Sequence, residues 1–134
     1  MRRDIYAGNL KFKGEENYNT LQAALNYAST LCELGRFEET KALLRTTMPL
    51  AQRVIGNDHD TTLKMRWIYA QALFQDANAT LDDLGEAVAT LEEIERTARR
   101  VLGGSHPLTT EIEKSLRDAR AALRARETPP GSHN

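Results

Sequence analysis

Apolar residues recur at intervals of three and four along most of the chain, which is the spacing of one side of an α-helix. The first stretch predicts a helix over residues 17–34, ended by Gly35, because glycine permits the left-handed turn that closes many helices. A second stretch predicts a helix over residues 37–55, with a kink or local break at Pro49, which has no N–H to donate. The apolar positions of this helical pair are Leu21, Ala24, Leu25, Ala28, Leu31, Cys32, Phe37, Leu43, Leu44, Met48, Ala51, Val54 and Ile55.

Three more helices are predicted by the same spacing. One starts with Asp60 or Thr61 as its cap and ends near Asp76; residues 77–81 either extend it or form a larger loop. The next runs to Leu102, and the last begins at Pro107, which suits a first helical turn, and ends near Glu127. Their apolar positions are Leu63, Trp67, Ala70, Leu73, Phe74, Leu84, Ala87, Val88, Leu91, Ile94, Ala98, Val101, Leu102, Ile112, Leu116, Ala119 and Leu123.

A short corner motif returns along the chain at a nearly constant distance. Residues 54–63 (VIGNDHDTTL) reappear as residues 101–110 (VLGGSHPLTT), with a weaker copy at residues 12–21 (FKGEENYNTL). Gly14 precedes Gly56 by 42 residues, and His59 precedes His106 by 47. A period of this size is typical of stacked supersecondary units, none of which can bury its apolar side alone.

The periodic region divides the chain into three parts. Residues 1–16 form an N-terminal arm, residues 17–127 form the repeat domain, and residues 128–134 form a flexible tail. Gly8 and Gly14 are expected to interrupt the arm. The arm could form a short helix or stay extended, and its apolar side chains could pack against the first repeat. Those side chains are Ile5, Tyr6, Leu10 and Phe12.

Composition excludes several classes of function. With 18 basic and 19 acidic residues the chain has no overall basic character, which argues against a nucleic-acid partner. There is no apolar run long enough to span a membrane and no signal peptide at residues 1–4, so we expect a cytoplasmic protein without a membrane partner. The single cysteine, Cys32, excludes an intramolecular disulfide.

No group of residues forms a recognisable catalytic, metal or cofactor site. His59 and His106 occupy the same place in the repeated corner, so capping or bracing a helix start explains both better than metal binding. Cys32 lacks a nucleophile motif and is predicted to be a structural thiol. Gly103-Gly104 lacks the lysine of a phosphate loop. We therefore expect no enzymatic activity, no metal and no cofactor.

The residue types at several repeat positions resemble the pattern of the tetratricopeptide repeat (TPR) family. They are the large–small pairs Tyr27-Ala28 and Tyr69-Ala70, Gly35 with Phe37, and the small residue Ala87. The period and the corner at residues 101–109 are similar to the repeats of kinesin light chains, over about residues 14–125. The resemblance implies an all-α, right-handed TPR-type helical-hairpin solenoid of about five helices. In the last helix Glu113, Arg117 and Arg120 replace apolar positions, as expected of a C-terminal capping helix.

The resemblance also implies a concave groove lined by the first helix of each repeat. The residues expected to bind a partner there are Gln22, Asn26, Ser29, Glu33, Lys64, Trp67, Gln71, Phe74 and Gln75. Trp67 and Phe74 would be aromatic anchors between polar contacts. Each has an alternative role: both aromatic side chains could instead fill space between helices, and the polar residues could form a solvated face.

These patterns favour a protein–protein interaction scaffold or adaptor that holds a peptide or partner protein in its groove. The alternatives are a self-association module that forms a homodimer and a regulatory segment of a larger protein.

Overall fold

The computed structural model describes residues 13–127, with side chains from Asn17 onward, and every regular element in this range is an α-helix. The five helices are α2 (Lys13–Glu33), α3 (Phe37–Val54), α4 (Asp60–Gln75), α5 (Leu81–Val101) and α6 (Pro107–Glu127). The prediction of an all-α fold with about five helices is confirmed for these residues. The predicted tail and most of the predicted arm, residues 128–134 and 1–12, lie outside the described residues.

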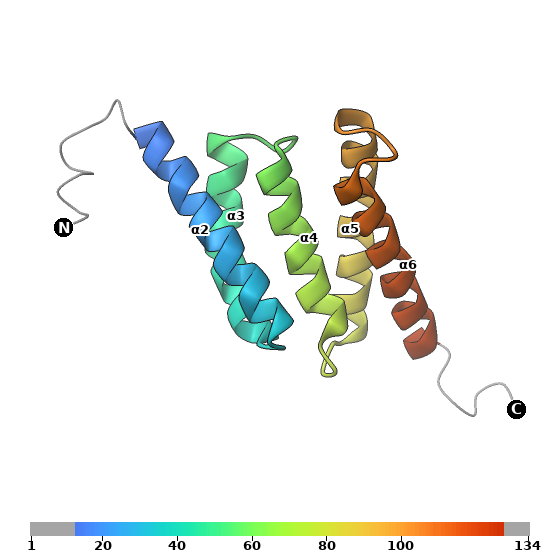
Figure 1. The fold of residues 1–134 in the computed structure, drawn as a ribbon. Helices are drawn as coiled ribbons and strands as arrows, with labels where there is room; N and C mark the ends of the chain where they lie inside the picture. Colours follow the sequence, from blue (N-terminus) through green and yellow to red (C-terminus); the bar gives the residue numbers. More distant parts are fainter. Residues whose placement is uncertain (1–12, 128–134) are drawn as a thin grey trace, which may run out of the picture.

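The helices stand side by side in two layers (Figure 1). Helices α2, α4 and α6 form the nearer layer of this view, and α3 and α5 lie behind them. Each helix packs against the next along the chain, and α4 also contacts both α2 and α6 within its own layer. Helix α4 therefore lies in the middle of the row, and α2 and α6 are its two ends.

Helix α4 contributes to two separate hydrophobic clusters. Its residues Leu63, Ala70 and Leu73 pack with α5 and α6. Its residues Met65 and Ile68 pack with α2 and α3. Because these two sets point to opposite sides of the helix, α4 is buried on both flanks.

Helix α6 is buried on one side only. Its buried residues are Leu108, Thr109, Ile112, Ser115, Leu116 and Ala119. On the other side Arg117 and Arg120 are exposed, as the sequence predicts, and Glu113 is half-buried. A polar outer side of this kind leaves the last helix without an apolar surface for another helix to cover.

The starts of α4 and α6 are built in the same way, around the repeated histidine. Nδ1 of His59 accepts a hydrogen bond from the backbone N–H of Thr61 at 3.1 Å, and Nδ1 of His106 accepts one from that of Leu108 at 3.0 Å. Each histidine thus satisfies a backbone donor that the first turn leaves free. This confirms the predicted capping role of the corner histidines, and it places the cap of α4 at His59 rather than at Asp60 or Thr61.

Glycines with positive φ follow the ends of α2, α3 and α5. Gly35, Gly56 and Gly103 have φ values of 78°, 90° and 98°, a left-handed conformation that other residues seldom adopt. The prediction for Gly35 is confirmed. Gly14 differs, because it lies inside the first turn of α2. The weaker copy of the corner at residues 12–21 is therefore a helix from Lys13 onward, and the prediction that Gly14 interrupts the chain is wrong.

The helix bounds bear on two further sequence expectations. Helix α3 continues through Pro49 to Val54. The predicted local break at the proline is therefore wrong, and the predicted kink stays a prediction. Residues 76–80 form a loop between α4 and α5, which decides between the two alternatives for the longer repeat. Helix α5 then starts with a capping box, in which Thr80 and Asp83 each bind the other's backbone N–H. None of the described helices combines the length and hydropathy that a membrane crossing requires.

Candidate binding surface

The candidate surface is the side of α4 that is left uncovered by the other helices between residues 13 and 127. Gln71 follows Lys64 by seven residues, about two turns, and Gln75 follows Gln71 by four, so the three share this side. Lys64 and Gln71 are half-buried and Gln75 is exposed, whereas the flanks of the same helix are buried. Three of the predicted binding residues are thus brought together on one accessible stripe.

Trp67 and Phe74 of α4 lie at the edge of this stripe and pack inward. Trp67 contacts both hydrophobic clusters, and Phe74 contacts the cluster shared with α5 and α6. The indole Nε1–H of Trp67 donates a hydrogen bond to Oγ of Ser115 in α6, at 2.8 Å. The structure thus gives Trp67 the interhelical packing role that the sequence left open. Its role as an anchor for a partner stays a prediction.

Gln22 holds α2 against the start of α4. Its amide nitrogen donates to the hydroxyl of Tyr18 and to Oγ1 of Thr61, both at 2.8 Å. The ring of Tyr18 meets the ring of His59 edge-on, with centroids 5.7 Å apart. The polar end of Gln22, expected to bind a partner, therefore already has partners within the protein.

The other predicted residues of α2 differ in position. Ser29 and Glu33 precede Gln71 and Gln75 by 42 residues and so occupy the matching places on α2. Ser29 is half-buried and Glu33 is exposed, like their counterparts. Asn26 is exposed but corresponds to Ile68, a residue of the flank that faces the preceding helices. Asn26 is therefore separated from the stripe formed by the others.

Sequence analysis missed the contribution of α6. The 47-residue offset pairs Lys64 with Glu111 and Gln71 with Asp118, and it pairs Trp67 with Lys114. Glu111, Lys114 and Asp118 are all exposed on α6. The same repeat that identified the residues of α4 could have identified these three, had the last helix not been assigned a capping role alone.

Gln71 has a feature that sets it apart from an ordinary surface glutamine. Its amide oxygen is out of contact with solvent and has no hydrogen-bond partner among the described residues. A buried acceptor without a donor is unfavourable by about 1–3 kcal/mol.

Cys32 lies one position before Glu33 and is half-buried. Burial, followed by the nearby Glu33 carboxylate, raises the pKa of its thiol to about 11. The reactive thiolate form is therefore scarce at neutral pH. This agrees with the sequence interpretation of a structural thiol.

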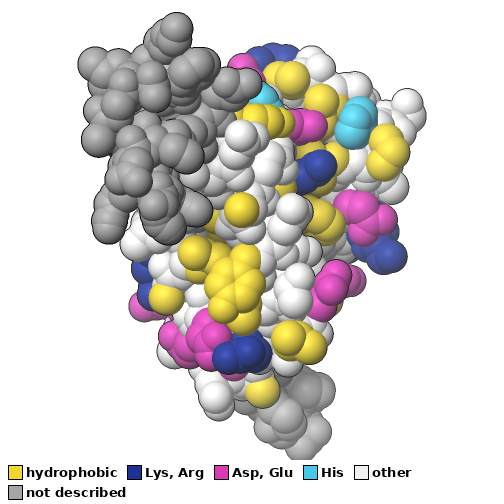
Figure 2. Space-filling view, turned by 60° about the vertical axis from the view of Figure 1, so that its left-hand side comes forward, with side chains coloured by type: hydrophobic (Ala, Val, Ile, Leu, Met, Phe, Trp, Pro, Cys, Tyr) yellow, Lys and Arg dark blue, Asp and Glu magenta, His cyan; other side chains and the backbone are white. Residues whose placement is uncertain are grey.

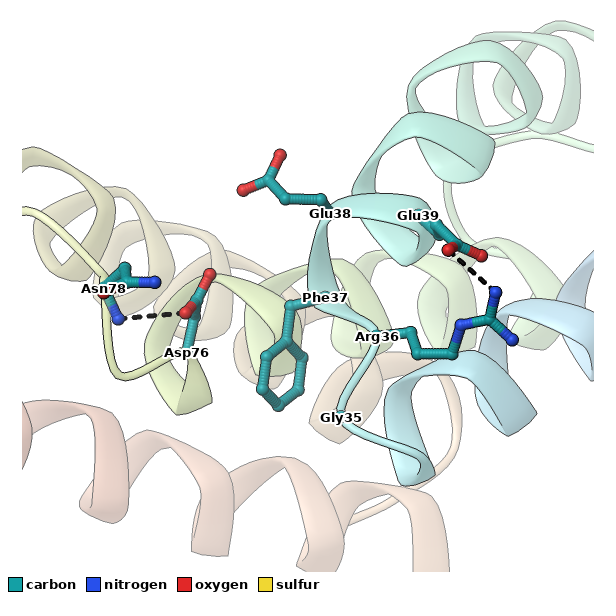
Figure 3. A pocket seen from close by; sticks show the side chains of 7 residues that line it. All are labelled: Gly35, Arg36, Phe37, Glu38, Glu39, Asp76 and Asn78. Carbon is teal, nitrogen blue, oxygen red and sulfur yellow. Dashed lines mark hydrogen bonds and ion pairs between the residues drawn. The ribbon is translucent and has the colours of Figure 1, made fainter.

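A separate cleft of about 300 Å³ lies where the α2–α3 turn meets the end of α4 (Figure 3). The ring of Phe37 lies between Gly35 and Asp76 in this view. The guanidinium of Arg36 binds Glu39 at 2.8 Å, and Oδ1 of Asp76 accepts the backbone N–H of Asn78 at 2.9 Å. These polar groups are satisfied within the protein, and none of the predicted binding residues lines the cleft.

The described residues contain no group of three or more His, Cys, Asp or Glu side chains placed to hold a metal ion. His59, the histidine with acidic neighbours, has Nδ1 engaged with the backbone of α4. The accessible chemistry of this surface consists of amides, hydroxyls, a few charges and aromatic edges.

Comparison of the chain with protein-family models, with curated proteins and with solved structures found no match. The TPR resemblance therefore rests on the residues named above.

Proposed function

We propose that the chain is a short right-handed solenoid of TPR-type helical hairpins that acts as a scaffold or adaptor. In this proposal a peptide segment of a partner protein lies across the layer formed by α2, α4 and α6. The partner is a cytoplasmic protein in the simplest case, and no metal, cofactor or nucleic acid takes part.

The observation that carries this proposal is the uneven burial of α4. Both flanks of the helix are covered, whereas on its remaining side Lys64 and Gln71 are half-buried and Gln75 is exposed. The edge of the stripe is held by Trp67, which is anchored to Ser115. Polar groups on a rigid helical support are suited to binding an extended or helical peptide.

The contacts between helices support a surface that is concave on this side. Helix α4 packs directly against α2 and α6, whereas α3 and α5 make at most marginal contact with each other. When neighbouring helices lie closer together in one layer than in the other, the row curves. The more closely packed layer then lines the concave side. The side chains of α2, α4 and α6 would then converge on a ligand.

A display library of random peptides, selected on the immobilised full chain, tests this proposal. The test variant combines Lys64→Glu with Gln71→Arg, which changes the charge and shape of the stripe without touching the hydrophobic clusters. We expect selected peptides to bind this variant at least tenfold more weakly, equivalent to about 1.4 kcal/mol.

The matched control is Arg53→Glu, which reverses a charge on an exposed residue of α3, in the other layer. Peptides should bind this control within about twofold of the wild type, because rim and remote charges contribute little. Peptides that bind all three proteins equally, or a selection that enriches none, would argue against the proposal.

Self-association is the second candidate, because the exposed side chains of Tyr27 and Leu34 leave apolar area on α2. Light scattering across a range of protein concentrations distinguishes the two functions. A tight homodimer in which Lys64 and Gln75 are protected from solvent would favour self-association over peptide binding.

A further inference from the structure

The two corner histidines are placed so that their protonation state decides whether the caps of α4 and α6 form. His59 and His106 are both half-buried. Figure 2 shows histidine side chains at the surface of the upper end of the molecule, where α4 and α6 begin. Each histidine accepts a backbone N–H at Nδ1, and a ring nitrogen accepts only while it carries no proton. Both caps therefore require a neutral imidazole whose proton is on Nε2.

Protonation of Nδ1 removes such a cap. The nitrogen becomes a donor and can no longer accept a hydrogen bond from the first turn. The positive imidazolium also lies at the N-terminus of a helix, where the helix dipole favours negative charge. A helix start of this kind is therefore weakened by acid, unless another group accepts the new N–H.

The two corners differ in whether that acceptor is present. At the start of α4, Oδ1 of Asp60 lies 3.2 Å from Nδ1 of His59. These two atoms repel each other while the ring is neutral and form an ion pair once Nδ1 is protonated. At the start of α6 the same position is occupied by Pro107. Within residues 13–127, the structure gives His106 no carboxylate at ion-pair distance.

The other charged groups near His59 come mainly from the neighbouring helices. Asp58 is paired with Arg100 of α5 at 3.5 Å, so the two charges largely offset each other. The last turn of α3, which leads into this corner, adds the exposed Arg53. From α2, the ring of Tyr18 meets the histidine ring edge-on. The carboxylate next to the ring therefore remains the group that decides what protonation of His59 costs.

The charged groups near His106 are already paired with one another. The guanidinium of Arg99 in α5 lies against Gly104, where a Cβ would stand only 2.9 Å from its Nη1. Arg99 forms ion pairs with Glu95, at 2.7 Å, and with Glu113 of α6. These two carboxylates therefore have a cation and are not in contact with the ring of His106.

The next charged residues along the two helices are Lys64 in α4 and Glu111 in α6. Each follows the histidine of its own corner by five positions, which is more than one helical turn. Charges at that separation interact weakly through solvent, compared with a carboxylate in contact with the ring. The difference between the corners therefore depends on Asp60 and Pro107.

We propose that the two corners respond differently to acid. Protonation removes the cap of α6, whereas the start of α4 exchanges its cap for the ion pair with Asp60. The first turn of α6 then loosens, and with it Leu108 and Thr109, which are buried. Because Leu108 belongs to the cluster that α6 shares with α4 and α5, the change weakens that end of the row. The proposal is independent of whether the groove binds a peptide.

The cap of α6 contributes stability while His106 is neutral. That contribution is lost as the pH falls through the range in which histidine side chains take up a proton, between about pH 8 and pH 5. Aspartate side chains remain ionised over this range, so the ion pair at the α4 corner stays available. For a domain of this size, the loss of one cap should lower the melting temperature by about 3–6 °C.

Melting temperatures of the full chain at about pH 7.5 and about pH 5 test the proposal. Asparagine is a good N-cap residue that takes up no proton, so it separates capping from protonation. His106→Asn should remove about 3–6 °C from the fall in melting temperature caused by acid. His59→Asn is the matched control and should leave this fall nearly unchanged.

The role of Asp60 is tested in the same way. Asp60→Asn should enlarge the fall caused by acid by about 3–6 °C, because the α4 corner then behaves like the α6 corner. Adding His59→Asn to this variant should remove the enlargement. Only the difference between the two pH values is compared, so an effect of either substitution on folding at neutral pH does not enter.

Imidazole ¹⁵N chemical shifts provide a local measurement that does not depend on unfolding. At about pH 7.5, Nδ1 of both corner histidines should carry no proton. A spectrum with the proton on Nδ1 of His106 would overturn the proposal. So would a fall in melting temperature that His106→Asn leaves intact, or one that His59→Asn and His106→Asn reduce equally.

Discussion

Helices α4 and α6 start with the same histidine cap, yet they bury different amounts of their surface. On one flank the two agree: Met65, Ile68 and Ala72 of α4 correspond to Ile112, Ser115 and Ala119 of α6, and all six are buried. On the other flank they differ, because the buried Leu63, Ala70 and Leu73 correspond to the exposed Thr110, Arg117 and Arg120.

This difference shows that position in the row decides what each residue of the repeat does. A helix between two neighbours needs apolar residues on both flanks, whereas the last helix needs them on one. The flank that packs on the preceding hairpin is the constant part of the repeat. The other flank changes from apolar to charged in α6, the last helix of the described range.

The largest expected loss of stability comes from a change on the flank that is buried in α4 but exposed in α6. Leu73→Ala should lower the free energy of unfolding by about 2–5 kcal/mol, because it leaves a cavity between α4 and α5. The matched change Arg120→Ala removes an exposed residue paired with Glu92 at 2.9 Å and should lower it by at most about 1 kcal/mol. Urea denaturation followed by circular dichroism measures both. Equal effects would mean that the two flanks are equivalent.

Loss of the hydrogen bond between Trp67 of α4 and Ser115 of α6 should have the next largest effect on stability. Ser115→Ala leaves the indole N–H of Trp67 without its acceptor and should lower the free energy of unfolding by about 1–2 kcal/mol. Trp67→Phe removes the donor together with part of the packing.

A double-mutant cycle isolates the bond itself. The variant with both changes should be more stable than the sum of the single effects predicts, with a coupling of about 1 kcal/mol. Simple additivity in the urea midpoints would show that the hydrogen bond between Trp67 and Ser115 contributes nothing to stability.

Removing either histidine cap should cause a smaller loss of stability, and the two losses should be similar in size. His106→Ala should lower the free energy of unfolding by about 1 kcal/mol, as expected for the loss of an N-cap. His59→Ala should lower it further, because it also removes the ring contact with Tyr18. Thermal unfolding of both variants measures the difference, and asparagine at either position should recover most of the loss. A larger effect at His106 would contradict this ranking.

The smallest effect concerns acid pH and the surface pair between α4 and α5. The Arg66 guanidinium, through a hydrogen bond of 2.8 Å and its charge, lowers the pKa of Glu93. Because the folded pKa is the lower one, the pair stabilises the protein fully above the ordinary pKa of about 4.3. That stabilisation is lost as the pH falls through the folded pKa.

Glu93→Gln should therefore lower stability at pH 7 by less than about 1 kcal/mol, since the carboxylate is largely exposed, and should have no such effect well below pH 4. Glu92→Gln, in the exposed pair with Arg120, serves as the comparison. Melting temperatures across the acid range measure both, and a stability difference for Glu93→Gln that persists at low pH would rule out this account.

The sequence predicted well those features that depend on neighbours along the chain. The all-α fold, the turn at Gly35, the capping histidines and the start of the last helix at Pro107 follow from spacing and local chemistry. The unbroken course of α3 through Pro49 does not follow in this way, because a proline inside a helix favours a kink or a break and only the break is excluded. Gly14 was also misjudged, because it lies inside the first turn of α2, where the first copy of the corner continues as helix.

The candidate surface was predicted less completely, for the same reason. The accessible stripe on α4 could be located from the repeat. The internal partners of Trp67 and Gln22 could not, because Ser115 and Thr61 lie 48 and 39 residues away in the sequence. Which side chains remain accessible depends on which neighbouring helices exist, and spacing within one helix does not contain that information.

Trp67 is the chain's single tryptophan, and it touches both hydrophobic clusters. Its fluorescence therefore senses the environment of each hairpin at once, and loosening of either one should alter the emission. Because α4 belongs to both halves, we expect neither half to melt alone, so that emission and helical ellipticity should follow one common transition.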